Sequence, residues 1–542
     1  MAGGAEIADA AVPSRKLPSA PLVAFVLTVV VALGFALYTQ HAWEDYWITY
    51  RASKNLATGH GLVFNVGDRL HTFTSPLGVL LPAIASVLTA NSSDAAALWI
   101  FRVMCAAALG GAAALLVLMT RQLNYGRIAA FFLVAWLATD AKIIDNTING
   151  METAFMMLFL AYALWSHTRA GPRSWLHLGA AWAGLMWTRP DSFVYIGLIA
   201  TGFWLFRDVQ ATGVKRSELV GLFIRAGLVT TALYLPWLAF AQFYYGTVVP
   251  HTVAAKSGVG DVHTVMGFLT ATIQLPFELS PQGSTQSRAF LPAYFMIGGW
   301  PPILLRLAWL AGMLCSVLWL VPKLRVETRV ASFAFFGGHA YLSYFPYYAF
   351  PWYLPSTTIL AFVALSGLVQ QASSRRWTRR GALGVAAASL CVASWTTWQV
   401  ARELRAQQRL VEDGNRRKIG EWLRANATPG QTVFLEPLGY IGFYSGLKTY
   451  DFPGMSSREM VAARQVVGND WNALIRYLHP DWLVLRPAEI ARVSARDSTL
   501  LRSDYAVAQE FSVADAVGKL KVYGRLSLMS DARYTVFRAA RR

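Results

Sequence analysis

Two adjacent acids, Glu44 and Asp45, stand where an apolar run ends and an aromatic segment begins. A helix through this segment would align four aromatic side chains on one face, namely Trp43, Tyr46, Trp47 and Tyr50. A carboxylate held beside aromatic rings at membrane depth is partly desolvated, which raises its pKa and suits it to act as a general base on a hydroxyl group. The stripe equally fits an aromatic belt at the headgroup level, with its acids pointing to water. We also consider Trp47 and Tyr50 candidates for an acceptor or lipid groove.

A second set of ionisable residues lies further along the chain: Glu152, Arg189, Asp191, His251 and Lys256. Charges this close to apolar segments are unfavourable unless they pair or line a wet cavity, so their accumulation indicates a site. Arg189 and Lys256 together suit a phosphate, because Arg offers a planar fork and Lys a point charge. Arg189 fits equally well as a structural clamp on Asp191. His251 has no second His or Cys at ligand spacing, so we interpret it as a hydrogen-bonding group rather than a metal ligand.

A third candidate region is the aromatic-rich stretch over residues 341–353, which includes Tyr347, Tyr348 and Trp352. Sugars stack their C–H faces on such rings, and lipid headgroups also favour them at the interface. The pattern is more typical of an aromatic belt, and an acceptor or lipid groove is the alternative.

The composition places these residues in a membrane protein. Hydrophobic residues make up 55% of the 542 residues and charged residues only 14%, with a mean hydropathy of +0.38. These values exclude a soluble multidomain chain and a disordered or nucleic-acid-binding one. The three cysteines lie in apolar runs and predict neither disulfides nor a Cys metal site. No nucleotide-binding loop or ligand cluster appears. We therefore predict no metal and no certain cofactor, with a divalent cation as the alternative.

The charge distribution sets the topology. A short apolar piece at residues 76–90 is too short to span the bilayer comfortably, and we expect it to lie in the interface. The Lys and Arg residues of the short loops then fall mostly on the side of the N-terminus, which the positive-inside rule makes cytoplasmic. We predict a polytopic α-helical bundle of about eleven transmembrane helices in residues 1–400. Two long loops, 40–95 and 243–290, would face outward.

Residues 401–542 differ in composition from the bundle. A charged, helix-like stretch at 402–426 precedes two strand-like runs at 432–435 and 482–485. We expect a small extracytoplasmic α/β domain, because the segment is long enough to fold as one.

Seven segments of the chain form a recognisable set, both in their residues and in their order along the chain. They are residues 44–51 (EDYWITYR), 55–65 (NLATGHGLVFN), 74–77 (TSPL), 149–153 (NGMET), 188–191 (TRPD), 244–256 (YYGTVVPHTVAAK) and 437–446 (PLGYIGFYSG). Together they resemble the GT-C glycosyltransferases, and most of all the terminal arabinofuranosyltransferases of bacterial cell envelopes.

The resemblance implies a GT-C-like, inverting, multi-pass glycosyltransferase of the bacterial plasma membrane. It would move a sugar, arabinofuranose by preference, from a polyprenyl-phosphate donor to an envelope glycan or glycolipid acceptor on the outer side. The family base maps to Glu44 or Asp45, and Asp45 is favoured because it directly precedes the aromatic-aliphatic-Thr segment. The resemblance departs from the family at two positions, since Glu44 replaces a usual Asp and His251 a usual Asn.

The resemblance and the residue types together assign the remaining candidates. Contacts to the donor phosphate or sugar are expected from Arg51, Glu152, Arg189, Asp191, His251 and Lys256. Membrane lipids are expected partners and nucleic acid is not. The alternatives are a protein O-glycosyltransferase, a GT-C enzyme that modifies lipid A or another glycolipid, and, from a different class, a transporter or flippase of lipid-linked sugars.

Overall fold

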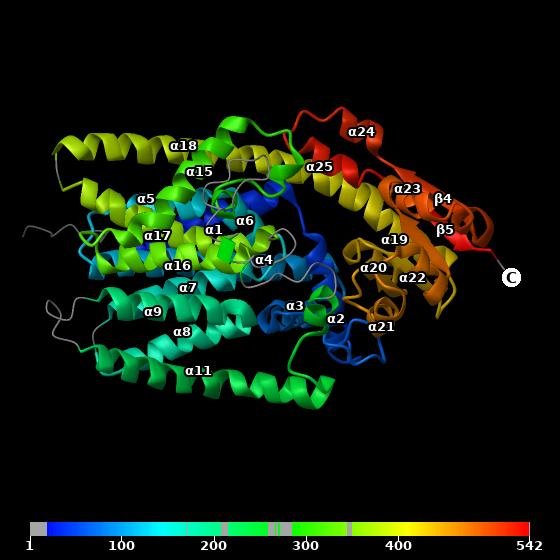
Figure 1. The fold of residues 1–542 in the computed structure, drawn as a ribbon, viewed down its shortest axis with the longest axis horizontal. Helices are drawn as coiled ribbons and strands as arrows, with labels where there is room; N and C mark the ends of the chain where they lie inside the picture. The colour runs from blue at the N-terminus through cyan, green and yellow to red at the C-terminus, as the bar shows by residue number, and fades with distance from the viewer. Residues whose placement is uncertain are drawn as a thin grey trace, which may run out of the picture.

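The computed structural model describes residues 19–540, apart from 170, 208–214, 258–265, 267–268, 271–284, 344–349 and 375. A helical bundle occupies one end of the molecule, and the C-terminal region caps the other end (Figure 1). Between them lie α2 (Glu44–Ala57) and α3 (Pro76–Leu88), which come from the loop after the first long helix. The elements that carry the predicted acids are therefore at the junction of the two regions.

The bundle packs its helices side by side along the long axis of the molecule. Its members are α1 (Ala20–Thr39), α4 (Asp94–Gln122), α5 (Arg127–Thr139), α6 (Ala141–Ile148), α7 (Thr153–Thr168), α8 (Ser174–Thr188), α9 (Phe193–Phe206), α11 (Arg216–Tyr245), α15 (Pro302–Val317), α16 (Val326–Ser343), α17 (Leu354–Ala372) and α18 (Arg376–Gln407). Helix α4 packs on α1 and α7, α8 on α7 and α11, and α16 on α9 and α17. Their apolar faces form one continuous core.

Six described helices are long and apolar enough to cross a membrane, or seven if the bent pair of α6 and α7 counts as one span. The chain is therefore a multi-pass membrane protein. Several further apolar helices, such as α5 and α9, are shorter than a typical span. The expected total of eleven spans stays a prediction. Helix α3 has 13 residues, too few to cross, as its sequence predicts.

The C-terminal region is built on a five-stranded mixed sheet with the order β2-β1-β3-β5-β4. The strands are β1 (Thr432–Leu435), β2 (Lys448–Asp451), β3 (Trp482–Leu485), β4 (Tyr505–Ser512) and β5 (Arg533–Ala539). Strand β1 pairs in parallel with β2 and β3, whereas β5 is antiparallel to β3 and β4. Both strands expected from the sequence, β1 and β3, are present with the expected bounds.

Helices surround this sheet and connect it to the bundle. They are α19 (Arg417–Asn426), α20 (Gly439–Ser445), α21 (Arg458–Val467), α22 (Trp471–Leu478), α23 (Pro487–Arg496), α24 (Ala514–Gly518) and α25 (Arg525–Ser530). A π-helical stretch, Gln408–Arg416, joins α18 to α19, so one nearly continuous helical rod runs from the bundle into the C-terminal region (Figure 1). The charged stretch at 402–426 is thus helical, as expected.

Candidate active site

The first turn of α2 sends its two acids in different directions. Successive residues of an α-helix are rotated by about 100°, so Glu44 and Asp45 cannot share one partner surface. Glu44 faces the C-terminal region, and Asp45 faces groups from the bundle and from the middle loop. The two candidate bases therefore occupy separate environments.

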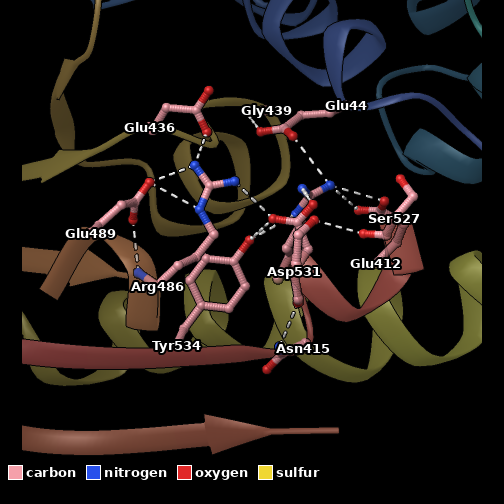
Figure 2. Close-up of polar contacts among 12 residues, drawn as sticks. Glu44, Glu412, Asn415, Glu436, Gly439, Arg486, Glu489, Ser527, Asp531 and Tyr534 are labelled. Carbon is pink, nitrogen blue, oxygen red and sulfur yellow. Dashed lines mark hydrogen bonds and ion pairs between the residues drawn. The ribbon is translucent and has the colours of Figure 1, made fainter. Parts of the chain in front are cut away.

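Glu44 is fully engaged by the C-terminal region. The backbone N–H of Gly439, the first residue of α20, donates to Glu44 Oε1 at 2.9 Å. Glu44 Oε2 lies 3.2 Å from Nη1 of Arg416 (Figure 2). A Cβ atom on residue 439 would lie 2.1 Å from the Glu44 carbonyl oxygen, so only glycine permits this approach. Glu44 is therefore a docking group with both carboxylate oxygens occupied.

The Glu44 contact is one edge of a larger ion-pair network. Arg416 also pairs with Glu412 at 3.0 Å and with Asp531 at 2.9 Å. Asp531 in turn pairs with Arg486 and accepts a hydrogen bond from Tyr534. Figure 2 shows these side chains converging between the π-helical stretch, β5 and the first turn of α2. Breaking such a network by removing one partner leaves buried charges without compensation.

Burial dominates the titration of Glu44 and raises the pKa of its carboxyl to about 8. Arg416 opposes this shift, and the nearby acids Glu412 and Glu436 add to it. A carboxyl with this pKa binds a proton more readily than usual, but its oxygens are already used in docking. The pKa alone therefore does not identify Glu44 as the base.

Arg51, predicted as a donor-phosphate ligand, has a different role in the structure. Its guanidinium donates to the carbonyl oxygens of Gly442, Gly446 and Leu447 at 2.7, 3.2 and 3.1 Å. These groups lie along α20 and just beyond its C-terminal end, where a cation is favoured by the helix dipole. In the structure the donors of Arg51 are therefore committed to these carbonyls, and its assignment to the donor phosphate stays a prediction.

Glu44 and Arg51 together clamp one short helix. They are seven residues apart on α2 and therefore lie on the same face. Glu44 contacts the first N–H of α20, and Arg51 contacts the carbonyls at its other end. Both contacts match the helix dipole, with an acid at the positive end and a base at the negative end.

The aromatic stripe of α2 is buried inside the protein. Tyr46 and Tyr50 are at most 1% exposed and Trp47 is 5% exposed. Trp47 packs against Tyr440, Phe443 and Tyr444 of α20, with ring centroids between 4.7 and 5.4 Å apart. The expectation of a belt at the headgroup level is therefore wrong, whereas the assignment of Trp47 and Tyr50 to an acceptor or lipid groove stays a prediction. The rings instead form the apolar part of the junction with α20.

Asp45 lies on the opposite side of this junction. Its carboxylate forms no ion pair and no hydrogen bond to another side chain of the described residues. Burial raises the pKa of Asp45 above its ordinary value. The charges of Lys256 and Arg189 act against this shift, and that of Glu152 adds to it. Asp45 is thus a desolvated carboxylate with free acceptor capacity that faces two cations.

Arg189 binds two carboxylates. Its Nη1 lies 3.1 Å from Glu152 Oε1, and its Nε lies 3.0 Å from Asp191 Oδ1. The guanidinium also lies over the ring of Tyr353, 4.2 Å from the centroid. The clamp between Arg189 and Asp191 that the sequence left open is therefore present, and Glu152 completes it. The two carboxylates largely neutralise the positive charge of Arg189.

The turn between α6 and α7 places Glu152 in this group. The backbone N–H of Trp43 donates to the Asn149 carbonyl at 2.9 Å, which ties the turn to the start of α2. Gly150 has a φ of 98°, and a Cβ there would lie 2.6 Å from atoms of Tyr46. Glycine is therefore required for the turn to approach α2 so closely.

Lys256 reaches the site on a short helix, α12 (His251–Ser257). His251 Nε2 donates to the carbonyl of Gly454 at 3.1 Å, and Arg464 Nη1 donates to the carbonyl of Ala255 at 2.7 Å. The C-terminal region therefore holds α12 from both ends. The Nε2 atom of His251 faces backbone carbonyls, and the assignment of His251 to the donor stays a prediction. The interpretation of His251 as a hydrogen-bonding group is correct.

Aromatic side chains border Lys256. Its Nζ lies 5.3 Å from the centroid of the Phe350 ring, and Phe350 stacks on Trp352 with centroids 4.6 Å apart. Trp352 is half-buried, so its predicted place in an acceptor or lipid groove stays open to test. Tyr347 and Tyr348 lie outside the described residues. Among the described residues, no group of three or more His, Cys, Asp or Glu side chains could hold a metal ion.

Three residues at the site were not identified from the sequence: Arg416, Gly439 and Arg464. Each holds α2 or α12 from the C-terminal region across hundreds of positions in the chain. Gly439 lies in one of the seven familiar segments, which could have singled it out. The sequence around Arg416 and Arg464 does not distinguish either residue, because each is one of many arginines in a basic region.

Comparisons with known proteins agree with this architecture. Residues 400–537 match the family model described as a domain of unknown function, DUF8728. The chain is 27% identical over 273 residues to a terminal β-(1→2)-arabinofuranosyltransferase of Corynebacterium glutamicum, covering 44% of this chain and 37% of the relative. A protein of the same name from Mycobacterium tuberculosis is 25% identical over 282 residues, covering 47% and 41%. The matched part thus spans about two fifths of these relatives.

The structural likeness extends over nearly the whole chain. ArnT from Cupriavidus metallidurans, solved with bound undecaprenyl phosphate, aligns with a TM-score of 0.52 and 14% identity over 95% of this chain and 97% of ArnT. Its apo form gives 0.53, with coverages of 96% and 98%. The chain therefore has the fold of ArnT, a GT-C glycosyltransferase. The resemblance inferred from the sequence motifs is confirmed.

Proposed function

We propose that the protein is an inverting membrane glycosyltransferase that uses a polyprenyl-phosphate sugar as donor. The observation that carries this proposal is the separation of the two acids, because it leaves Asp45 free, desolvated and facing Lys256 in a GT-C fold. The names of the sequence relatives support arabinofuranose as the sugar. The lipid phosphate bound to ArnT supports the donor class.

In the proposed reaction, Asp45 takes the proton from an acceptor hydroxyl group. The acceptor oxygen forms a bond to the anomeric carbon as the bond from that carbon to the phosphate oxygen breaks. The pair of electrons leaves with the polyprenyl phosphate, whose growing negative charge Lys256 stabilises. Attack opposite the leaving group inverts the anomeric configuration. Each group that the reaction needs is thus supplied by α2 or α12.

The carboxylates around Arg189 suit contacts to the sugar rather than to the phosphate. Glu152 and Asp191 are anchored by Arg189 and retain acceptor capacity for sugar hydroxyl groups. Arg189 contributes by holding them and by moderating the local negative charge. The proposal therefore assigns the phosphate mainly to Lys256.

We further propose that Glu44 and Arg51 are positioning residues. They fix α2 against α20, while His251 and Arg464 fix α12 against the same region. The C-terminal region would then set the distance between base and cation without touching the substrate itself. In the cell, we place the N-terminus in the cytoplasm and both the site and residues 401–542 on the outer side of the plasma membrane, with an envelope glycan as acceptor.

The test is turnover of a panel of synthetic polyprenyl-phosphate sugars by the purified full chain, with release of lipid phosphate as the readout. We expect release from the arabinofuranose donor in the presence of an acceptor, and its loss in the D45N variant. Release from a different donor would correct the sugar. No release from any donor by a folded protein, together with movement of a donor across vesicles, would instead support a flippase.

A further inference from the structure

The α24 and α25 helices form a short hairpin, residues 514–530, that rests on the bundle beside α15 and α18 (Figure 1). The backbone N–H of Gly524 donates to Glu403 at 3.1 Å, and a Cβ at this position would overlap the Glu403 carboxylate. The ring of Tyr523 packs on Trp300 and Trp395, with centroids 5.2 and 5.6 Å away. The hairpin is thus fixed to the bundle by both polar and aromatic contacts.

The aromatic contacts indicate how deep the hairpin lies. Trp300 precedes α15, whose apolar span begins at Pro302, and Trp395 lies near the end of the apolar part of α18. Tryptophan gathers at the boundary between hydrocarbon and headgroups. We therefore expect a hairpin that packs on both rings to lie at the level of the lipid headgroups.

The outer surface of the hairpin combines cations with apolar side chains. Lys519, Lys521 and Arg525 are exposed, and none of them pairs with an acid of the described residues. Leu526 is 50% exposed and Met529 is 37% exposed. Ile297 is a further exposed apolar side chain at the same place, because it is next to Gly298, where an added Cβ atom would lie 3.6 Å from Leu526. Asp515 is the acid on the exposed part of the hairpin, so cations are in excess there.

We propose that this surface docks on anionic phospholipid headgroups of the adjacent leaflet. Basic side chains beside exposed apolar ones are the pattern of elements that lie in the membrane interface, where phosphate groups meet the cations and acyl chains cover the apolar groups. Nearby Arg402 donates to the Lys521 carbonyl at 3.2 Å and ties the basic loop to α18. Lipid contact here would hold the C-terminal region at a fixed height over the bundle.

The test compares the full chain in nanodiscs of phosphatidylcholine with nanodiscs that also contain phosphatidylglycerol. Hydrogen exchange of the amides in residues 518–530 is the readout, and it does not depend on glycosyl transfer. We expect slower exchange when phosphatidylglycerol is present. A cation near an anionic surface contributes about 1 kcal/mol, or about fivefold in binding, so each charge removed should reduce the lipid-dependent protection by about that factor.

The K519Q/K521Q/R525Q variant should lose the lipid-dependent protection and keep the exchange rate seen in phosphatidylcholine. The matched control is R492Q/R496Q/R502Q, which removes the same charge from α23 and the turn after it, further from the bundle. It should behave like the wild type. High salt should abolish the effect of phosphatidylglycerol on the wild type. Equal exchange of the wild type in both lipids, or equal loss in the control variant, would overturn the proposal.

Discussion

The two sides of the first turn of α2 differ in how completely their charges are satisfied. On the side of Glu44, the carboxylate is bound by a backbone N–H and by an arginine that itself binds two more acids. On the side of Asp45, the carboxylate has no side-chain partner among the described residues and faces Lys256. Adjacent residues of the same chemical type thus separate into one acid that is bound by the C-terminal region and one that retains free acceptor capacity. The difference teaches that two adjacent acids are told apart by their free acceptor capacity rather than by their position in the sequence, and the proposed base is the acid that retains it.

The largest effect should come from Asp45. We expect D45N to lower kcat by about 10²- to 10⁴-fold, because that is the usual contribution of a general base. The melting temperature should stay close to that of the wild type, since Asp45 has no partner to lose. E44Q is the matched neighbour and should retain most of the activity. If E44Q abolished transfer while D45N left it intact, the two roles would be reversed.

Removal of Arg416 should have the largest effect on stability. Replacing it by Met leaves the buried Glu412 without its cation, removes the ion pair of Glu44 and leaves Asp531 paired with Arg486 alone. We expect this to lower the free energy of unfolding by about 3–5 kcal/mol. Thermal unfolding of the purified protein measures this.

Arg417 provides the control for Arg416. It is the next residue and pairs with Glu421 at 2.8 Å, but both side chains are nearly half exposed. R417M should therefore change stability by less than about 1 kcal/mol. Similar losses in both variants would mean that the network in Figure 2 is no stronger than a surface pair.

Lys256 tests the reactive side of the comparison. K256M should lower kcat by about 10²- to 10³-fold if the cation stabilises the departing phosphate. It should also move the acid limb of the pH profile to higher pH. The charge of Lys256 holds down the pKa of Asp45, so without it the base remains protonated up to a higher pH.

A control for Lys256 is available on α2 itself. Lys54 pairs with Asp94 at 2.8 Å and is absent from the charges that act on Asp45. K54M should leave the acid limb unchanged. An unchanged limb in K256M would show that Lys256 and Asp45 do not interact.

Glu44 gives a pH-dependent prediction on the structural side. Its folded-state pKa of about 8 lies above the ordinary value of 4.5, so between these values the folded protein binds more protons than the unfolded chain. Stability from this group is therefore complete at low pH and is lost as the pH rises toward 8. The E44Q variant has no carboxyl group to ionise at this position, so it lacks this pH-dependent contribution to stability. We expect the melting temperature of E44Q minus that of the wild type to increase as the pH rises from 4.5 to about 8. A difference that does not change with pH would contradict the raised pKa of Glu44.

Part of the fold, and part of the difference between Glu44 and Asp45, could be predicted from the sequence. Strands β1 and β3 were predictable because each is a short apolar run next to polar or turn-forming residues. Helical geometry also predicts that Glu44 and Asp45 diverge and that Arg51 shares the face of Glu44. The motif order predicted the fold and indicated Asp45.

The partners of those faces could not be predicted. Gly439 and Arg416 are far from α2 in the chain, and nothing local to Arg51 distinguishes a helix cap from a phosphate ligand. The prediction that the aromatic stripe of α2 lies at the headgroup level was wrong for a similar reason. Its pattern is the same whether lipid headgroups or α20 cover the rings, and the tertiary fold decides between them.

The smallest effect is expected at His251, which links the two sides by holding the helix that carries Lys256. Loss of one neutral hydrogen bond in H251A should reduce stability by about 0.5–1.5 kcal/mol and raise KM for the donor more than it lowers kcat. H251Q should restore both values, because the amide nitrogen of Gln can occupy the position of Nε2 and still donate to the Gly454 carbonyl. If H251A instead removed activity while Gln failed to restore it, the imidazole itself would take part in the reaction. The active site would then include both ends of α12, from His251 to Lys256.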